Sequence, residues 1–116
     1  MNTNAKGAKL ERRARDLFKE NSAAFIVRAA GSFGPVDLVL FYEGTISTLP
    51  FVKFVQVKSN KWPSEVEFNL LAKMSKTFRA EALVVRYDDG IKIPKIKSHP
   101  WPAEGVWTDF VFVGKK

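Results

Sequence analysis

Residues 36–58, VDLVLFYEGTISTLPFVKFVQVK, contain two apolar runs joined by a short polar connection. The pattern predicts a strand over 36–42, interrupted by one charged residue, Asp37, and a second strand over 51–58. Two such runs in succession indicate that a β-sheet forms the centre of the fold. A carboxylate stands at the start of the first strand.

Sequence on either side of this stretch predicts helices that could cover the sheet. Residues 5–21 form an amphipathic pattern, whose apolar stripe consists of Leu10, Ala14, Leu17 and Phe18. Ser64 and Glu67 have the spacing of a capping box, which opens a second helix. Residues 81–87 are then rich in β-forming side chains, so a strand follows this helix.

The order of these elements predicts an α/β fold with a central mixed β-sheet flanked by helices. A short strand over 25–28 precedes the two central strands, and a β-rich tail ends in a strand over 106–113. The strand at 81–87 is expected to pair parallel to its neighbour through the helical crossover. No repeat, low-complexity tract or linker interrupts the pattern, so residues 1–116 are expected to form a single domain.

The composition of the chain excludes several kinds of site and indicates the kind of partner. The chain has 116 residues with 19 Lys and Arg against 12 Asp and Glu, a net charge of +7, and no cysteine. Thiolate zinc sites, disulfides and cysteine nucleophiles are therefore excluded. No apolar run is long enough for a membrane span, and the polar N-terminus does not resemble a signal peptide, so we expect an intracellular protein without membrane contact. The positive charge favours an anionic partner, most commonly nucleic acid, although a basic surface kept for solubility is the alternative.

Four polar residues are expected to meet on the predicted sheet. Asp37 begins one central strand, and Gln56 and Lys58 share one face of the next because side chains alternate along a strand. Glu11 lies at the inner border of the first helix, from which it can lean toward the sheet. Two carboxylates, an amide oxygen and an ammonium suit a hard divalent cation such as Mg²⁺ and a phosphate substrate.

Each of these residues also has an ordinary structural interpretation. A lone aspartate in a strand is most often a hydrogen-bonded structural acid, and a lysine at a strand end is usually solvated. The combination is more specific than its parts.

The combination resembles the active-site pattern of the PD-(D/E)xK nuclease superfamily, in which an acid precedes an acid-x-Lys motif by about twenty residues. Within this superfamily, the chain is similar to the archaeal-type Holliday-junction resolvases, and the similarity covers roughly residues 6–59. The residues that carry it are Lys6-Gly7, Glu11-Arg12, Arg28, Gly31-Ser32, Asp37-Leu38-Val39 and Gln56-Val57-Lys58. The resemblance implies a restriction-endonuclease-like αβββαβ core. It also implies a homodimer that resolves four-way DNA junctions by paired cuts.

Site residues follow from the resemblance, position by position. It implies a catalytic set of Glu11, Asp37, Gln56, Lys58 and Ser32. It implies a metal set of Glu11, Asp37, Gln56 and the carbonyl of Val57. The metal would be Mg²⁺, with Mn²⁺ expected to substitute. It implies DNA contacts from Lys6, Arg12, Arg28 and Ser32, and we add Lys61 beside them.

Two departures from the family pattern stand out. The family usually has glutamate where this chain has Gln56, which removes one negative charge from the site. Gln-x-Lys forms occur elsewhere in the superfamily, so we interpret this as a variant site. Val36 replaces the proline that commonly precedes the aspartate, at a position that shapes the chain and does no chemistry.

The sequence therefore predicts a Mg²⁺-dependent, structure-selective DNA endonuclease that resolves Holliday junctions. Another nuclease of the superfamily, with a restriction or repair role, remains an alternative, as does a junction-binding module whose catalytic site has decayed. His99 and the tail aromatics Trp101 and Trp107 are expected to have structural or surface roles. For Trp62 we expect either packing against the second helix or stacking on a DNA base. For the lysines at 92, 95 and 97 we expect either a solvated strand edge or contacts to phosphate.

Overall fold

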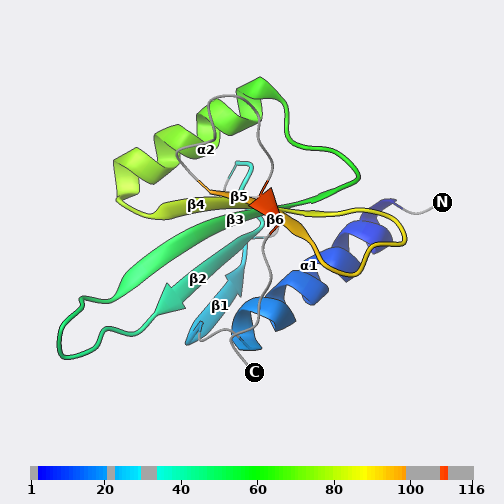
Figure 1. The fold of residues 1–116 in the computed structure, drawn as a ribbon. Helices are drawn as coiled ribbons and strands as arrows, with labels where there is room; N and C mark the ends of the chain where they lie inside the picture. Colours follow the sequence, from blue (N-terminus) through cyan, green and yellow to red (C-terminus); the bar gives the residue numbers. More distant parts are fainter. Residues whose placement is uncertain (1–2, 21–22, 30–33, 99–107, 110–116) are drawn as a thin grey trace.

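A computed structural model describes residues 3–20, 23–29, 34–98 and 108–109; of residues 3–6 and 108–109 it describes the backbone alone. Two helices and six strands make up the described part of the chain (Figure 1). In chain order they are α1 (Thr3–Glu20), β1 (Phe25–Arg28), β2 (Leu38–Tyr42), β3 (Phe51–Ser59), α2 (Glu65–Phe78), β4 (Glu81–Tyr87), β5 (Lys95–Ser98) and β6 (Thr108–Asp109).

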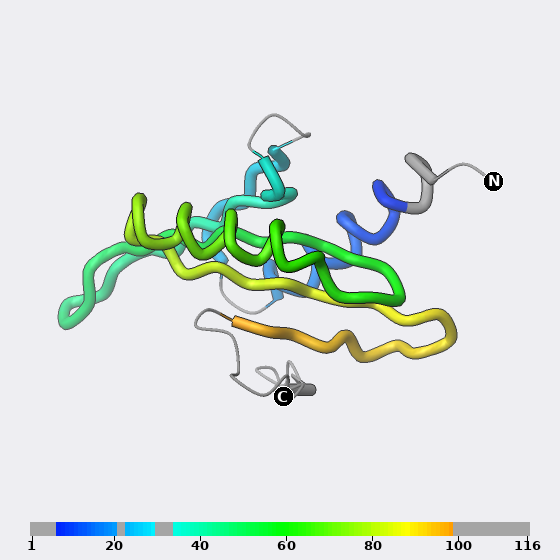
Figure 2. The backbone as a smooth tube through the Cα atoms, turned by 90° about the horizontal axis from the view of Figure 1, so that it is seen from above, coloured from blue at the N-terminus to red at the C-terminus, as the bar shows by residue number. Residues whose placement is uncertain are grey.

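The six strands form one mixed sheet, whose spatial order is the chain order β1-β2-β3-β4-β5-β6. Strands β3 and β4 pair in parallel, with Gln56 opposite Val84, and every other neighbouring pair is antiparallel. The parallel pair requires a crossover, which α2 supplies (Figure 2). The predicted mixed sheet and helical crossover are therefore confirmed.

The two helices lie on opposite faces of the sheet, as Figure 1 shows. Residues of α1 pack against one side of the central strands, in a core that includes Ala14, Phe18, Val55 and Val85. On the other side, Leu71 of α2 belongs to a second core. Strand β4 is buried between the two, because its successive side chains enter opposite cores.

Local chemistry fixes the start and the end of α2. The Ser64 side chain accepts a hydrogen bond from the Glu67 backbone N–H, and the Glu67 side chain accepts one from the Ser64 N–H, which confirms the capping box. The helix ends at Arg79, which adopts the left-handed conformation with φ 54° and donates its N–H to the Ser75 carbonyl.

The connection between β2 and β3 projects beyond the sheet (Figure 1). It turns tightly at Gly44, where a Cβ atom would lie 2.6 Å from the Thr48 carbonyl oxygen, so a larger residue is excluded there. Side chains in the loop are exposed, including Ile46 and Leu49.

Most of the elements predicted from the sequence are confirmed within a few residues. The first central strand begins at Leu38 and not at Val36, so Asp37 stands just before it. Of the final strand predicted over 106–113, the structure describes only Thr108–Asp109, and the rest lies outside the described residues. Among the described residues, no helix is both long enough and apolar enough to cross a membrane.

Candidate active site

Asp37 joins the entry of β2 to the middle of β3. Its backbone N–H donates to the Val55 carbonyl at 2.8 Å, and its side-chain Oδ2 accepts from the Val57 N–H at 2.8 Å. The residue is therefore held beside β3 by two hydrogen bonds, one of which is made by its carboxylate. The sequence placed this residue at the strand start, and the structure confirms it.

The surroundings of Asp37 favour its neutral form. Burial is the main cause, and it raises the pKa of this carboxyl from 3.8 to about 6. The Val57 N–H and the Lys58 ammonium act in the opposite direction, while the carboxylates of Glu11 and Glu67 add to the increase. At neutral pH the protein therefore holds a costly negative charge at this position.

Glu11 approaches the same place from α1, at the inner border where the sequence predicted it. Its Oε1 accepts from Arg28 Nε at 2.8 Å, an ion pair that joins α1 to β1. The Glu11 side chain is 19% exposed and the Arg28 side chain 58% exposed, so most of the guanidinium faces solvent. Arg28 can therefore neutralise Glu11 and still be reached by an anionic ligand.

A hollow of about 310 Å³ lies beside these residues. Its lining consists of Gly7, Leu10, Glu11, Asp37, Val57, Lys58 and Ser59. Three of the predicted catalytic side chains and the predicted carbonyl donor thus line one small depression. This arrangement brings together residues from α1, β3 and the segment before β2.

Gln56 departs from the expected arrangement. We expected its amide on the face covered by the helix that carries Glu11, but β3 turns Phe54 toward α2 and Val55 and Val57 toward α1. By the same alternation Gln56 lies under α2, where Nε2 donates to Glu67 Oε2 at 3.3 Å, and it does not line the hollow. The sequence pattern defined the two faces of the strand, but it did not show which helix covers which face.

The other end of the Gln56 amide has an unusual environment. The side chain is only 5% exposed, and Oε1 accepts no hydrogen bond from any residue that the structure describes. A buried acceptor without a donor is costly, so this atom calls for a partner such as a water or a cation. The unsatisfied oxygen is the atom that stands where a carboxylate oxygen would be in a glutamate at this position.

Glu67 is a residue of this site that the sequence interpretation missed. Besides Gln56, its carboxylate meets Lys58, whose Nζ lies 3.7 Å from Glu67 Oε1. The capping-box spacing identified Glu67 only as a helix-start residue. Its second role depends on α2 lying over β3, which local sequence does not reveal.

The remaining predicted site residues are dispersed. Arg12 is exposed on α1 and shares a hollow of about 170 Å³ with Glu11, Arg15 and Arg28. Lys61 is exposed after the end of β3. The side chain of Lys6 lies outside the described part, as do Ser32 and the whole of 99–107 with His99 in it.

Trp62 packs against α2, which confirms one of the two roles expected for it. It joins the core beneath α2, and the cations of Arg86 and Lys97 lie 5.4 Å and 5.3 Å from its ring. Lys97 also lies 4.9 Å from the ring of Phe68 and is buried, and burial lowers its pKa. Both predictions for Lys97, a solvated edge and a phosphate contact, are therefore wrong.

The oxygen donors present fit a hard cation better than a soft one. Asp37, Glu11 and the unsatisfied oxygen of Gln56 are oxygen donors of the kind that Mg²⁺ prefers, and Mg²⁺ commonly keeps several waters. Within the described ranges, no group of three or more His, Cys, Asp or Glu side chains is arranged to hold a metal ion. Side-chain carboxylates alone therefore do not form a complete donor set among these residues.

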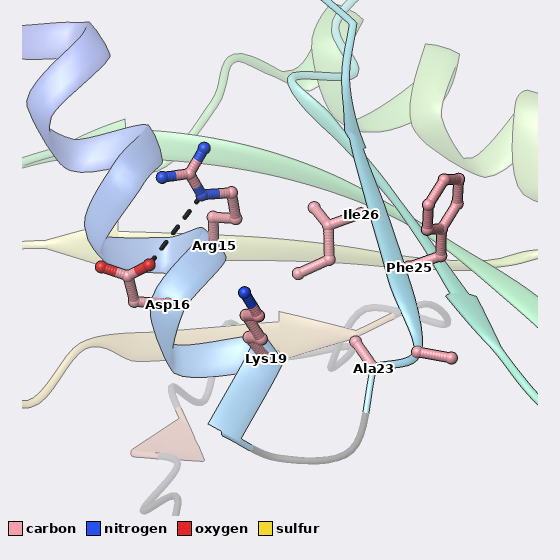
Figure 3. A pocket seen from close by; sticks show the side chains of 7 residues that line it. Arg15, Asp16, Lys19, Ala23, Phe25 and Ile26 are labelled. Atoms are coloured by element: carbon pink, nitrogen blue, oxygen red, sulfur yellow. Dashed lines mark ion pairs between the residues drawn. The ribbon is translucent and has the colours of Figure 1, made fainter.

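A second hollow, of about 430 Å³, lies at the other end of α1 (Figure 3). Arg15 and Lys19 line it together with apolar residues of β1, and its carboxylate, Asp16, lies 3.9 Å from Arg15. This hollow has one acid among its lining residues, so it lacks the paired donors found beside Asp37.

Comparison with known proteins agrees with the fold. No protein-family model and no curated protein matches the sequence. Among solved structures, a match with a TM-score of 0.56 and 26% identity covers 78% of this chain and 70% of the other. The chain thus has a nuclease-like α/β fold, a single mixed sheet with a helix on each face. The matching structure is that of Hjc from Archaeoglobus fulgidus, a Holliday junction resolvase from an archaeal hyperthermophile.

Proposed function

We propose that this protein is a Mg²⁺-dependent, structure-selective DNA endonuclease that resolves four-way junctions. The observation that carries the proposal is the hollow in which Glu11, Asp37 and Lys58 meet, in a chain whose fold is similar to that of a junction resolvase. An acid pair beside a lysine suits hydrolysis of a phosphodiester.

The residues of the hollow have distinct proposed roles. Asp37, Glu11 and the carbonyl of Val57 would hold Mg²⁺ from within the hollow, and the Gln56 oxygen would reach it from outside the lining. Mg²⁺ when bound supplies an activated water and balances charge on the phosphate. Lys58 lines the hollow, and its ammonium would orient the attacking water or stabilise charge that develops on the phosphate.

Basic residues around the hollow would contact the DNA backbone. Arg12 and Arg28 line the neighbouring depression, and Lys61 is exposed after β3. Lys6 and Ser32 remain proposed contacts from the sequence. Such contacts fix the register of a protein on DNA, and the net charge of +7 favours the encounter.

We also propose that the protein acts as a homodimer. Helix α2 covers the central strands and leaves part of the same face uncovered at β1 and β2, where Phe25, Val27 and Phe41 are exposed. Exposed apolar residues next to one another are typical of an interface. A dimer with two-fold symmetry presents two identical sites, as the two cuts in a four-way junction require.

Cleavage of a substrate panel tests the proposed activity. Purified protein is incubated with labelled four-way junction, flap, linear duplex and single strand, with Mg²⁺, with Mn²⁺ and without metal. We expect paired cuts in the junction that depend on the metal and are lost in Asp37→Ala, while Asp16→Ala, on the exposed side of α1, cuts normally. An Asp37→Ala protein that cuts like the wild type contradicts the proposal. Equal cleavage of linear duplex indicates a restriction-like or repair-like nuclease.

Two observations favour a second candidate, a junction-binding protein that no longer cuts. The chain has Gln56 in place of an acid, and the described residues contain no three-acid group. Such a protein binds junctions but cleaves none. Its binding weakens with salt: in a plot of log affinity against log salt concentration, the slope is about −0.9 for each contacted phosphate. Activity that appears only in Gln56→Glu supports this candidate, and activity in the wild type excludes it.

A further inference from the structure

The carboxylate of Glu67 joins both motif residues of β3 to the start of α2. Glu67 Oε2 accepts from Gln56 Nε2 at 3.3 Å, and Oε1 lies 3.7 Å from Lys58 Nζ. The same Oε1 accepts from the Ser64 N–H at 3.2 Å. One acid therefore contacts the amide, the ammonium and the helix cap at once.

The position of this acid is well determined by the helix that carries it. The reciprocal hydrogen bonds with Ser64 hold the first turn of α2, and the positive end of the helix dipole favours a carboxylate there. The negative charge is thus fixed on the α2 side of β3.

This charge determines which way the Gln56 amide points. A carboxylate accepts hydrogen bonds and donates none, so the amide must turn its NH₂ group toward Glu67. Its oxygen then faces away from Glu67, and it is this oxygen, buried, that accepts no hydrogen bond from the described residues. With Glu67 in place, the orientation that leaves Oε1 available is the favoured one.

The same geometry explains why an amide, and not an acid, stands at position 56. A carboxylate there would lie about as close to Glu67 as the amide does, and a buried negative charge at position 56 would be repelled by the half-buried carboxylate of Glu67. Gln56 and Glu67 together carry one negative charge, which is the charge that a single acid at position 56 would bring.

We propose that Glu67 is a positioning residue of the candidate active site: it orients the Gln56 oxygen as a cation ligand, holds the Lys58 ammonium, and supplies the negative charge missing at position 56. The inference rests on the metal site of the proposed function. It makes Gln56 and Glu67 a matched pair, in which the acid and the amide can exchange places but neither can change alone without loss.

The test compares the wild type with Glu67→Gln, Gln56→Glu, the double variant Gln56→Glu/Glu67→Gln, and Ser64→Ala. Glutamine also satisfies the third helical position of a capping box, so Glu67→Gln removes the charge and keeps the cap. Ser64→Ala weakens the cap and keeps the charge. These two variants separate a role in the site from a role in the helix.

Two measurements are made on each protein, the Kd for Mn²⁺ by calorimetric titration and the urea midpoint without metal. We expect Glu67→Gln to weaken Mn²⁺ binding about tenfold, which corresponds to about 1.4 kcal/mol. The double variant should return to within about threefold of the wild type, and Ser64→Ala should bind Mn²⁺ like the wild type. Gln56→Glu should lower the urea midpoint, and the double variant should restore it.

Three results overturn the inference: Mn²⁺ affinity unchanged in Glu67→Gln, a double variant that binds worse than both single variants, or a wild type that binds no Mn²⁺. Junction cleavage is scored separately. A wild type that binds Mn²⁺ and shows the exchange between the two positions, but cuts no junction, contradicts the proposed function and supports the role of Glu67.

Discussion

The half-buried carboxylate of Asp37 should reduce the stability of the protein at neutral pH. Replacing it by asparagine keeps the shape and an oxygen that accepts from the Val57 N–H, whose bond to Asp37 measures 2.8 Å, but removes the charge. We therefore expect Asp37→Asn to be more stable than the wild type and to have lost its metal-dependent activity.

The magnitude follows from the pKa of this group. In the unfolded chain the carboxyl titrates near 3.8 and in the folded protein at about 6. Between these values the folded protein holds a proton that the unfolded chain has lost, so the free energy of unfolding falls as pH rises. At about 1.4 kcal/mol per pH unit, the full cost above pH 6 is about 3 kcal/mol.

Urea unfolding in the absence of divalent metal measures this cost. At about pH 7.5 we expect Asp37→Asn to exceed the wild type by about 1–3 kcal/mol, with relaxation of the partly exposed site accounting for the lower figure. At about pH 4.5 the Asp37 carboxyl of the folded wild type is already protonated. The difference in free energy of unfolding between Asp37→Asn and the wild type should therefore shrink by up to about 2 kcal/mol. Asp16→Asn, on a 68% exposed side chain, is the matched control and should change by less than about 0.5 kcal/mol.

The reasoning is refuted if Asp37→Asn is less stable than the wild type at neutral pH, or if its advantage does not depend on pH. Either result would mean that burial does not raise the pKa of this carboxyl as the structure indicates.

Three further predictions concern the surroundings of the site. Arg28→Ala removes the partner of Glu11 from a mostly exposed pair, so the free energy of unfolding should change by at most about 1 kcal/mol. Junction affinity, measured by titration over a range of salt, should fall, and its salt slope should decrease by about 0.9 if one phosphate contact is lost; an unchanged slope contradicts this contact. Leu71→Ala empties a fully buried position on the core-facing side of α2 and should cost about 2–5 kcal/mol in urea unfolding, whereas a cost below about 1 kcal/mol would mean that the core closes over the gap. Ser64→Ala should cost about 1 kcal/mol in the same measurement through loss of the helix cap, and no loss would show that the cap contributes nothing to stability.

Local patterns predicted the elements of the fold well. Alternation along 51–58 and the capping box at Ser64 are properties of a few neighbouring residues, and both are confirmed. The position of Asp37 at the entry of β2 followed from its place beside an apolar run. These features depend on backbone periodicity and hydrogen bonding, which act over short distances along the chain.

The missing parts of the site depend on which helix covers which face of the sheet. Gln56 was expected beside Glu11 but lies under α2, and Glu67 was recognised only as a cap. Lys97 was expected at the surface but is buried against the rings of Trp62 and Phe68. Each error concerns a contact between distant segments, which alternation and spacing leave undetermined.

The hydrogen bond from the Val57 N–H to Asp37 gives this protein an intrinsic spectroscopic probe. The resonance of one backbone amide of β3, that of Val57, depends on the charge of a side chain at the site. A single cross-peak in a nitrogen–proton correlation spectrum should therefore move as Asp37 is protonated or takes up a cation. Occupancy of the site can then be followed in solution without substrate and without an attached label.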